Sequence, residues 1–205
     1  MKTMDTTLLN QASLEDDIAL DMIQYAQYQN QSAVSIHEHN KEFKQCLFEG
    51  VNFEDTTFEN SYFIDITFKN CDLSNIKLYA CLLRRVQFIN CKCLGSDFSE
   101  SVFDNIIMTD CLCGFANFAF MKNKEVRFTN CDFQNASFLE TKLNKTSYDE
   151  CSFTECEFLH SSLYNIDLST CRLEGILISP TDIQGAIIDS YQASSLIHLL
   201  KVKVK

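Results

Sequence analysis

Residues 131–140 read CDFQN ASFLE, two five-residue units with a Phe at the centre of each and a small residue two positions earlier. The pattern continues in both directions, from Phe43 to Ile188, without a change of phase. Every fifth residue of this stretch is Phe, Leu, Ile, Met, Tyr or Cys, with Asn123 as the exception. A period of five matches neither a helix nor a strand, so the stretch is a structural repeat.

A second period of twenty residues is nested in the first, because six cysteines recur at that spacing: Cys71, Cys91, Cys111, Cys131, Cys151 and Cys171. Four pentads therefore form one coil, and equivalent pentads stack in successive coils. The pattern predicts an all-β, square-sectioned solenoid over residues 41–190, with two inward side chains per pentad and turns between the faces. We number the faces from the first coil: face 1 contains residues 41–45, face 2 46–50, face 3 51–55 and face 4 56–60, and each face continues every twenty residues.

All eleven cysteines fall at inward positions of the pentads. Parallel side chains on stacked strands do not converge as a disulfide requires, and a free Cys behaves as a small buried hydrophobe. The cysteines are therefore predicted to fill the core, and the chain is expected to need no disulfide, metal ion or cofactor.

Residues 1–40 precede the repeat and are predicted to form a helical extension. Residues 13–16 resemble a capping box, and Leu14, Ile18, Met22 and Tyr25 follow at helical spacing, which indicates a helix from about 13 to 29. Two roles are open for this helix: it covers the exposed end of the first coil, or it binds a partner.

One pentad breaks the chemistry of the repeat without breaking its phase. It consists of Met121, Lys122, Asn123, Lys124 and Glu125, and it places an amide at a core centre. An unpaired buried amide costs about 1–3 kcal/mol. We therefore expect a local bulge or a surface loop at 121–125, and a protruding loop would offer a contact site.

After Ile188 the period changes, and residues 191–205 are predicted to form a helix and a short strand. Asp189 and Gln192 have the spacing of a capping box. The segment carries apolar residues that so short a helix must bury elsewhere: Tyr191, Leu196, Ile197, Leu199, Leu200, Val202 and Val204. They either cap the solenoid or pack on their symmetry mates in a homodimer, and the sequence favours the homodimer.

The net charge of −11 is unevenly distributed. Face 1 carries eight basic and five acidic residues, whereas faces 2, 3 and 4 each have a net charge of −4. The candidate interaction residues are carboxylates of faces 3 and 4: Glu54, Asp55, Asp72, Asp132, Glu155, Glu174, Asp97, Glu100, Glu140 and Glu157.

This acidic surface disfavours nucleic acid as a partner, because nucleic-acid binding depends on Lys and Arg that neutralise phosphates. It favours a basic protein surface, including one that normally holds DNA. The alternative is that the acidic residues only keep a repetitive rod soluble.

The sequence contains no Gly-rich phosphate loop, metal-ligand spacing or nucleophile motif, and a thin rod filled with Phe and Leu offers no cleft. We therefore predict that the protein is not an enzyme. No long apolar run suits a membrane span, and residues 1–10 lack the apolar region of a signal peptide. The chain is accordingly expected to be cytoplasmic, without contact to membranes.

The pentads at 131–140, and the in-phase pentads on either side, resemble those of the pentapeptide repeat proteins over about 41–190. The resemblance implies a right-handed quadrilateral β-helix. Residues 182–185 (DIQG) and 189–194 (DSYQAS) are similar to the end of the Qnr quinolone-resistance proteins.

In the Qnr subfamily, and in the related MfpA proteins, a C-terminal module joins two rods into an acidic dimer that resembles DNA and binds type II topoisomerases. The resemblance implies that this chain binds DNA gyrase or topoisomerase IV and protects it from quinolones or peptide toxins. The alternative is a scaffold or effector repeat protein with an unrelated partner.

Overall fold

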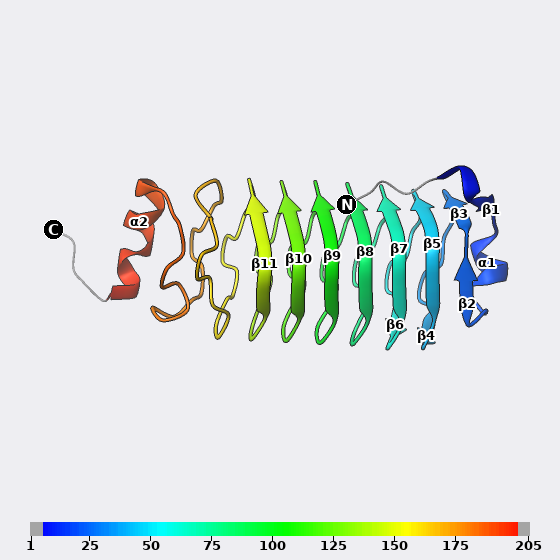
Figure 1. The fold of residues 1–205 in the computed structure, drawn as a ribbon, viewed down its shortest axis with the longest axis horizontal. Helices are drawn as coiled ribbons and strands as arrows, with labels where there is room; N and C mark the ends of the chain where they lie inside the picture. The colour runs from blue at the N-terminus through cyan, green and yellow to red at the C-terminus, as the bar shows by residue number, and fades with distance from the viewer. Residues whose placement is uncertain (1–5, 201–205) are drawn as a thin grey trace.

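The computed structural model describes residues 6–200, which form a rod with its strands lying across the long axis (Figure 1). The strands are β1 (Asn10–Gln11), β2 (Met22–Gln24), β3 (Ala26–Gln29), β4 (His37–His39), β5 (Glu42–Glu49), β6 (Thr57–Glu59), β7 (Tyr62–Lys69), β8 (Leu82–Ile89), β9 (Val102–Thr109), β10 (Lys122–Thr129) and β11 (Lys142–Asp149). The helical segments are η1 (Thr6–Leu8), α1 (Leu14–Asp17), α2 (Ser190–Leu196) and η2 (Ile197–Leu200).

The twenty-residue period determines the strand pairing. The main sheet has the order β1-β3-β5-β7-β8-β9-β10-β11, with β2 also beside β5, and β4 pairs separately with β6. Along the path β5-β7-β8-β9-β10-β11 the paired residues are twenty positions apart in parallel strands, as Phe43 is from Phe63 and Phe63 from Leu83. These strands cover faces 1 and 2, while faces 3 and 4 are joined by short parallel bridges such as Asp72 to Lys92. The expected parallel four-sided β-helix is confirmed.

The core consists of the inward side chains of successive coils, stacked in columns. Phe118 and Phe138 are parallel rings with centroids 4.7 Å apart, and Phe138 and Phe158 follow at 4.8 Å. These distances match the spacing of about 4.8 Å between neighbouring strands. Where rings occupy the same position of successive coils, they therefore stack face to face at the strand spacing.

The helix expected over 13–29 is wrong beyond Asp17, where α1 ends. Residues 22–24 and 26–29 form strands β2 and β3 instead, and they extend the solenoid by pairing with β5. Ile23 and Tyr28 point into the core, and the Tyr28 ring stacks on Phe48 with centroids 5.1 Å apart. Stacking on a finished coil buries these side chains more completely than an exposed amphipathic helix would.

The short helix α1 covers the open end of the rod (Figure 1). The Ser13 hydroxyl accepts a hydrogen bond from the backbone N–H of Asp16, and Leu14 and Ile18 are buried in the core. The Tyr28 hydroxyl donates to the Asp17 carboxylate at 2.7 Å and holds the helix against the first coil. The structure therefore supports the covering role over the partner-binding role.

The bulge or loop expected at 121–125 is also wrong. Residues 122–129 form the regular strand β10, in which Asn123 pairs in register with Phe103 of β9 and Leu143 of β11. The Asn123 side chain is buried, and its carbonyl oxygen has no hydrogen-bond partner among the described residues. The backbone keeps its register here although an amide occupies a core position.

At the other end of the rod, α2 begins with the expected capping box between Asp189 and Gln192. The Gln192 amide also donates to the backbone carbonyls of Leu168 and Cys171, and Leu196 is buried against the core. Helix α2 therefore covers the last coils. The Leu200 side chain and the predicted strand residues Val202 and Val204 lie outside the described residues.

We predict that Asn123→Leu stabilises the protein, because it removes a buried amide whose carbonyl oxygen is unpaired and restores an apolar side chain like those of the neighbouring coils. The expected gain in unfolding free energy is about 1–3 kcal/mol, measured by urea denaturation. The matched control is Leu83→Asn on the same face, which should lose a similar amount. A destabilised Asn123→Leu variant would contradict the absence of a partner for this amide.

Candidate protein-interaction surfaces

The solenoid brings the ten candidate carboxylates together on two adjacent faces. The most exposed of them are Glu54, Asp55, Glu100, Glu140, Glu155 and Glu174. The other four lie at the bridge positions between coils and are half-buried: Asp72, Asp97, Asp132 and Glu157. Residues far apart in sequence thus form continuous acidic columns along the rod.

These carboxylates differ from those of face 1 in how their charge is compensated. Within residues 6–200, Asp72 is the only one of the ten with an ion pair, to Lys92 at 2.9 Å. On face 1, Asp104 pairs with Arg84 at 3.1 Å and Glu125 with Lys145 at 2.9 Å. The negative charge of the rod is therefore largely uncompensated on faces 3 and 4.

Backbone and hydroxyl groups orient the half-buried carboxylates. Asp132 accepts from the N–H of Gln134 at 3.1 Å, and Glu157 accepts from the Ser137 hydroxyl at 2.7 Å. Burial alone would raise the pKa of Asp72, but hydrogen bonds from Ser74 and Lys92 outweigh it, so the pKa is lowered. This residue therefore keeps its negative charge at neutral pH.

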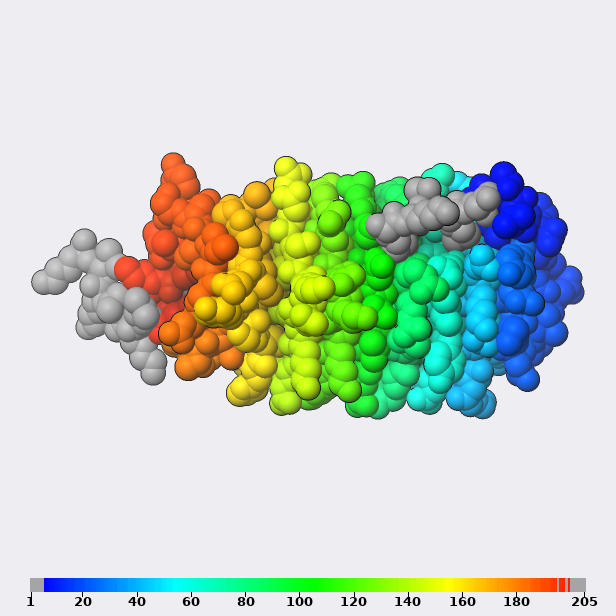
Figure 2. Space-filling model, viewed as in Figure 1, coloured from blue at the N-terminus to red at the C-terminus, as the bar shows by residue number. Residues whose placement is uncertain are grey.

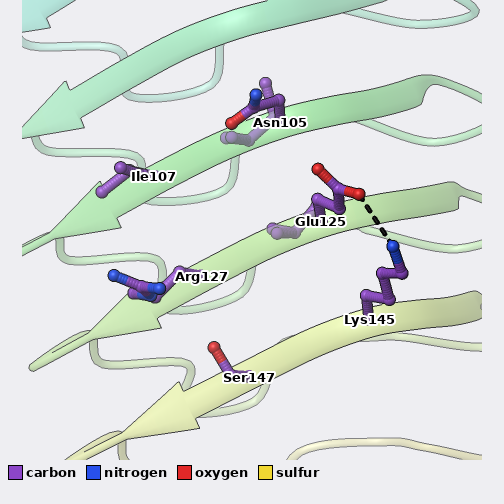
Figure 3. A pocket seen from close by; sticks show the side chains of 8 residues that line it. Asn105, Ile107, Glu125, Arg127, Lys145 and Ser147 are labelled. Carbon is purple, nitrogen blue, oxygen red and sulfur yellow. Dashed lines mark hydrogen bonds and ion pairs between the residues drawn. The ribbon is translucent and has the colours of Figure 1, made fainter. Parts of the chain in front are cut away.

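A shallow hollow lies on the opposite side of the rod, across β9, β10 and β11 (Figure 3). Figure 3 shows Glu125 and Arg127 on β10, between Asn105 of β9 and Lys145 of β11. Lys145 is paired with Glu125, whereas Arg127 has no ion pair within the described part of the chain. The hollow contains none of the candidate carboxylates and is not part of the acidic surface.

Two exposed aromatic residues, Phe115 and Phe120, border face 4 and were not among the sequence candidates. Each occupies the last position of a pentad, where the chain turns from one face to the next. Most other pentads have a polar residue or Gly at this position, and this contrast is the signal in the sequence that could have identified them.

The cysteines occupy the core as expected, and all eleven are free and buried. The Cys81 thiol donates to the backbone carbonyl of Phe58, and burial raises the pKa of Cys81 to about 12. Residues 6–200 contain no group of three His, Cys, Asp or Glu side chains placed to hold a metal ion. That the protein needs no cofactor remains a prediction.

No helix within the described residues has the length and apolar character needed to cross a membrane. Figure 2 shows the coils as successive bands along the rod, with α2 and the preceding residues closing one end.

Comparison with known proteins agrees with the geometry of the coils. Residues 41–118 match the family model described as a pentapeptide repeat region, and the same twenty-residue register continues beyond them. Residues 41–118 therefore form a pentapeptide repeat region. No curated protein sequence matches it.

Two solved structures are similar to this chain over most of its length. A trypsin-treated variant of QnrB1, described as a plasmid-mediated fluoroquinolone resistance protein, is 22% identical, with 90% of this chain and 98% of that chain covered and a TM-score of 0.43. HetL from the cyanobacterium Nostoc sp. strain PCC 7120, described as involved in heterocyst differentiation regulation, is 13% identical, with 82% and 90% covered and a TM-score of 0.41. At these identities neither likeness assigns a partner to this chain.

We predict that the thiols of the folded protein react with a water-soluble thiol reagent only as fast as the coils open, because burial both blocks access and raises the pKa of groups such as Cys81. Labelling is followed by mass spectrometry in the native buffer and in urea. All eleven thiols should react after unfolding. Rapid native labelling of one cysteine would show that it is accessible or activated.

Proposed function

We propose that this pentapeptide repeat protein is a non-enzymatic DNA mimic that binds a bacterial type II topoisomerase, DNA gyrase or topoisomerase IV, and protects it from quinolones or peptide toxins. The observation that supports the proposal most directly is the row of uncompensated carboxylates on faces 3 and 4 of a straight rod. The proposal places the chain in the cytoplasm, where it would meet the enzyme.

The charge density of the acidic side supports the comparison with DNA. Faces 2, 3 and 4 each carry a net charge of −4 over residues 41–190. At the strand spacing these residues span about 36 Å, so the three faces together carry one net negative charge about every 3 Å. One strand of B-DNA carries one charge about every 3.4 Å. A protein groove that attracts DNA would therefore attract this rod.

We further propose that two chains pair through their C-terminal ends, which would double the length of the acidic rod. Apolar side chains line an open hollow between α2 and the last coil: Pro180, Ile183, Ala186, Ile188, Ala193, Leu196, Ile197 and Leu199. Tyr191 on α2 is 85% exposed, so the helix also presents an aromatic side chain to solvent. A second copy of the chain is the proposed occupant, because the hollow lies at the end of the rod, away from its acidic faces.

The proposed function predicts that the wild-type protein competes with DNA for gyrase and restores supercoiling in the presence of ciprofloxacin. Reversing three carboxylates of face 3, in the variant Asp132→Lys, Glu155→Lys and Glu174→Lys, should weaken binding to gyrase by about tenfold or more. The measurement is a supercoiling assay with purified gyrase, together with calorimetric titration.

The matched control reverses three ion-paired carboxylates on the other side of the rod, in the variant Asp65→Lys, Asp104→Lys and Glu125→Lys, and should retain binding. Equal loss in both variants would argue against a face-specific interaction. Inhibition of gyrase without protection would identify a regulator instead. No effect on gyrase or topoisomerase IV would favour a scaffold with an unrelated partner.

The proposed dimer predicts a change of mass on substitution at the C-terminal hollow. Wild-type protein should sediment as a dimer, whereas Ile197→Glu should sediment as a monomer, because a carboxylate would be buried in the apolar contact. Ile89→Glu, on face 2 and away from the C-terminus, is the control and should remain a dimer. A monomeric wild-type protein would contradict the proposed dimer, and α2 would then only cap the solenoid.

A further inference from the structure

The corners of the solenoid impose an unusual backbone conformation. The last residue of most pentads has a positive φ, which lets the chain turn from one face to the next. Asn, Asp and Gly tolerate this conformation, whereas a bulky side chain in it is an outlier. Phe115 and Phe120 adopt it nevertheless, with φ of 59° and 60°.

Phe115 and Phe120 are also the two phenylalanines that lie outside the core. The chain has seventeen phenylalanines, and the fifteen at pentad centres are at most 2% exposed. Phe115 is 70% exposed and Phe120 is 46% exposed. Neither ring therefore obtains from the fold the burial that would offset its backbone strain.

The backbone on either side holds both residues in place. The N–H of Phe115 donates to the carbonyl of Gln134 at 2.8 Å, and the N–H of Phe120 donates to that of Leu139 at 2.8 Å. The conformation thus belongs to the corner, and an Asn in either place would fit it with less strain. The fold gives no reason for an aromatic residue at these two corners.

Apolar side chains lie near Phe115 on the acidic side of the rod. Leu94 and Leu112, which are both exposed, lie on face 3 near Phe115. The Leu94 side chain lies over Gly114, where an added Cβ would be 3.4 Å from it. Gly95 occupies the same corner one coil before Phe115, and it has no side chain that could cover the ring.

The charge around Phe120 indicates the chemistry of a partner. Its corner is occupied by Glu100 one coil earlier and by Glu140 one coil later, and both are exposed. Neither carboxylate has an ion pair within residues 6–200. An apolar pocket with a basic rim would complement this arrangement, whereas a second copy of the chain would bring like charges together.

We propose that Phe115 and Phe120 are the anchoring residues of the acidic interface, and that they insert into an apolar pocket with a basic rim on the partner. The inference rests on the proposed function, in which that partner is a type II topoisomerase. The carboxylates attract and orient the partner, and the aromatic rings supply the desolvated contact that usually dominates the affinity of an interface. A rod with charge alone would bind any basic groove, whereas two rings one face apart select one surface.

The test is the double variant Phe115→Asn and Phe120→Asn, with binding to purified gyrase measured by calorimetric titration and stability by thermal unfolding. The affinity should fall by about tenfold or more. The melting temperature should stay the same or rise, because Asn tolerates a positive φ and exposed apolar surface is removed. The matched control is Tyr25→Asn, since Tyr25 is an exposed aromatic residue at a corner with φ of 57° near the N-terminal end. It should retain full affinity.

The outcomes separate this inference from the proposed function. If wild-type protein binds gyrase, charge reversal of face 3 abolishes binding and the Asn variant binds as the wild type does, the anchoring role is overturned and the proposed function stands. A lower melting temperature of the Asn variant would assign the rings a structural role and overturn the inference as well. If wild-type protein binds neither gyrase nor topoisomerase IV, the proposed function fails and this inference fails with it.

Discussion

The structure depends on the match between the thickness of an aromatic ring stack and the spacing of parallel strands. Stacked ring centroids in the core columns lie 4.7–5.3 Å apart, as in the pairs Phe118–Phe138 and Phe133–Phe153. Neighbouring strands are separated by about 4.8 Å. The same coil can therefore be repeated without strain in the core, and a shift of one residue would move every ring to the outside. Register, shape and surface pattern all follow from this match.

Because the inward side chains alone form the core, the outward residues can differ from face to face. Acidic and basic residues pair along face 1, as in Asp104 with Arg84, whereas most carboxylates of faces 3 and 4 have no cation within the described residues to compensate them. Exposed ion pairs add little stability, so this division is not needed for folding. It gives the rod one face with a net positive charge and three faces with a net negative charge. This difference determines how the rod would be oriented in the field of a basic partner.

The repeat from 41 to 190, the inward cysteines and the capping box at Asp189 could all be predicted from the sequence, because each depends on a residue type at a fixed spacing. The start of the solenoid could not, since the apolar residues from Leu14 to Tyr25 fit a helix as well as a coil, and stacking on β5 decides between them. At Asn123 the sequence predicted a bulge or loop where the strand is regular. Losing the pairing of β10 with both neighbouring strands would cost more than one unpaired amide, so the register is kept.

The candidate site was less predictable than the fold, because the period identifies which residues face outwards but not how they interact. The ion pairs that neutralise face 1 join residues twenty positions apart and depend on side-chain reach. The corners are informative outward positions, since nearly all of those in the repeat carry a polar residue or Gly. An exposed aromatic residue at such a corner, as Phe115 is, gains little burial from the fold. In a repeat whose core tolerates little variation, such corners are where an interaction can be added without disturbing the stack.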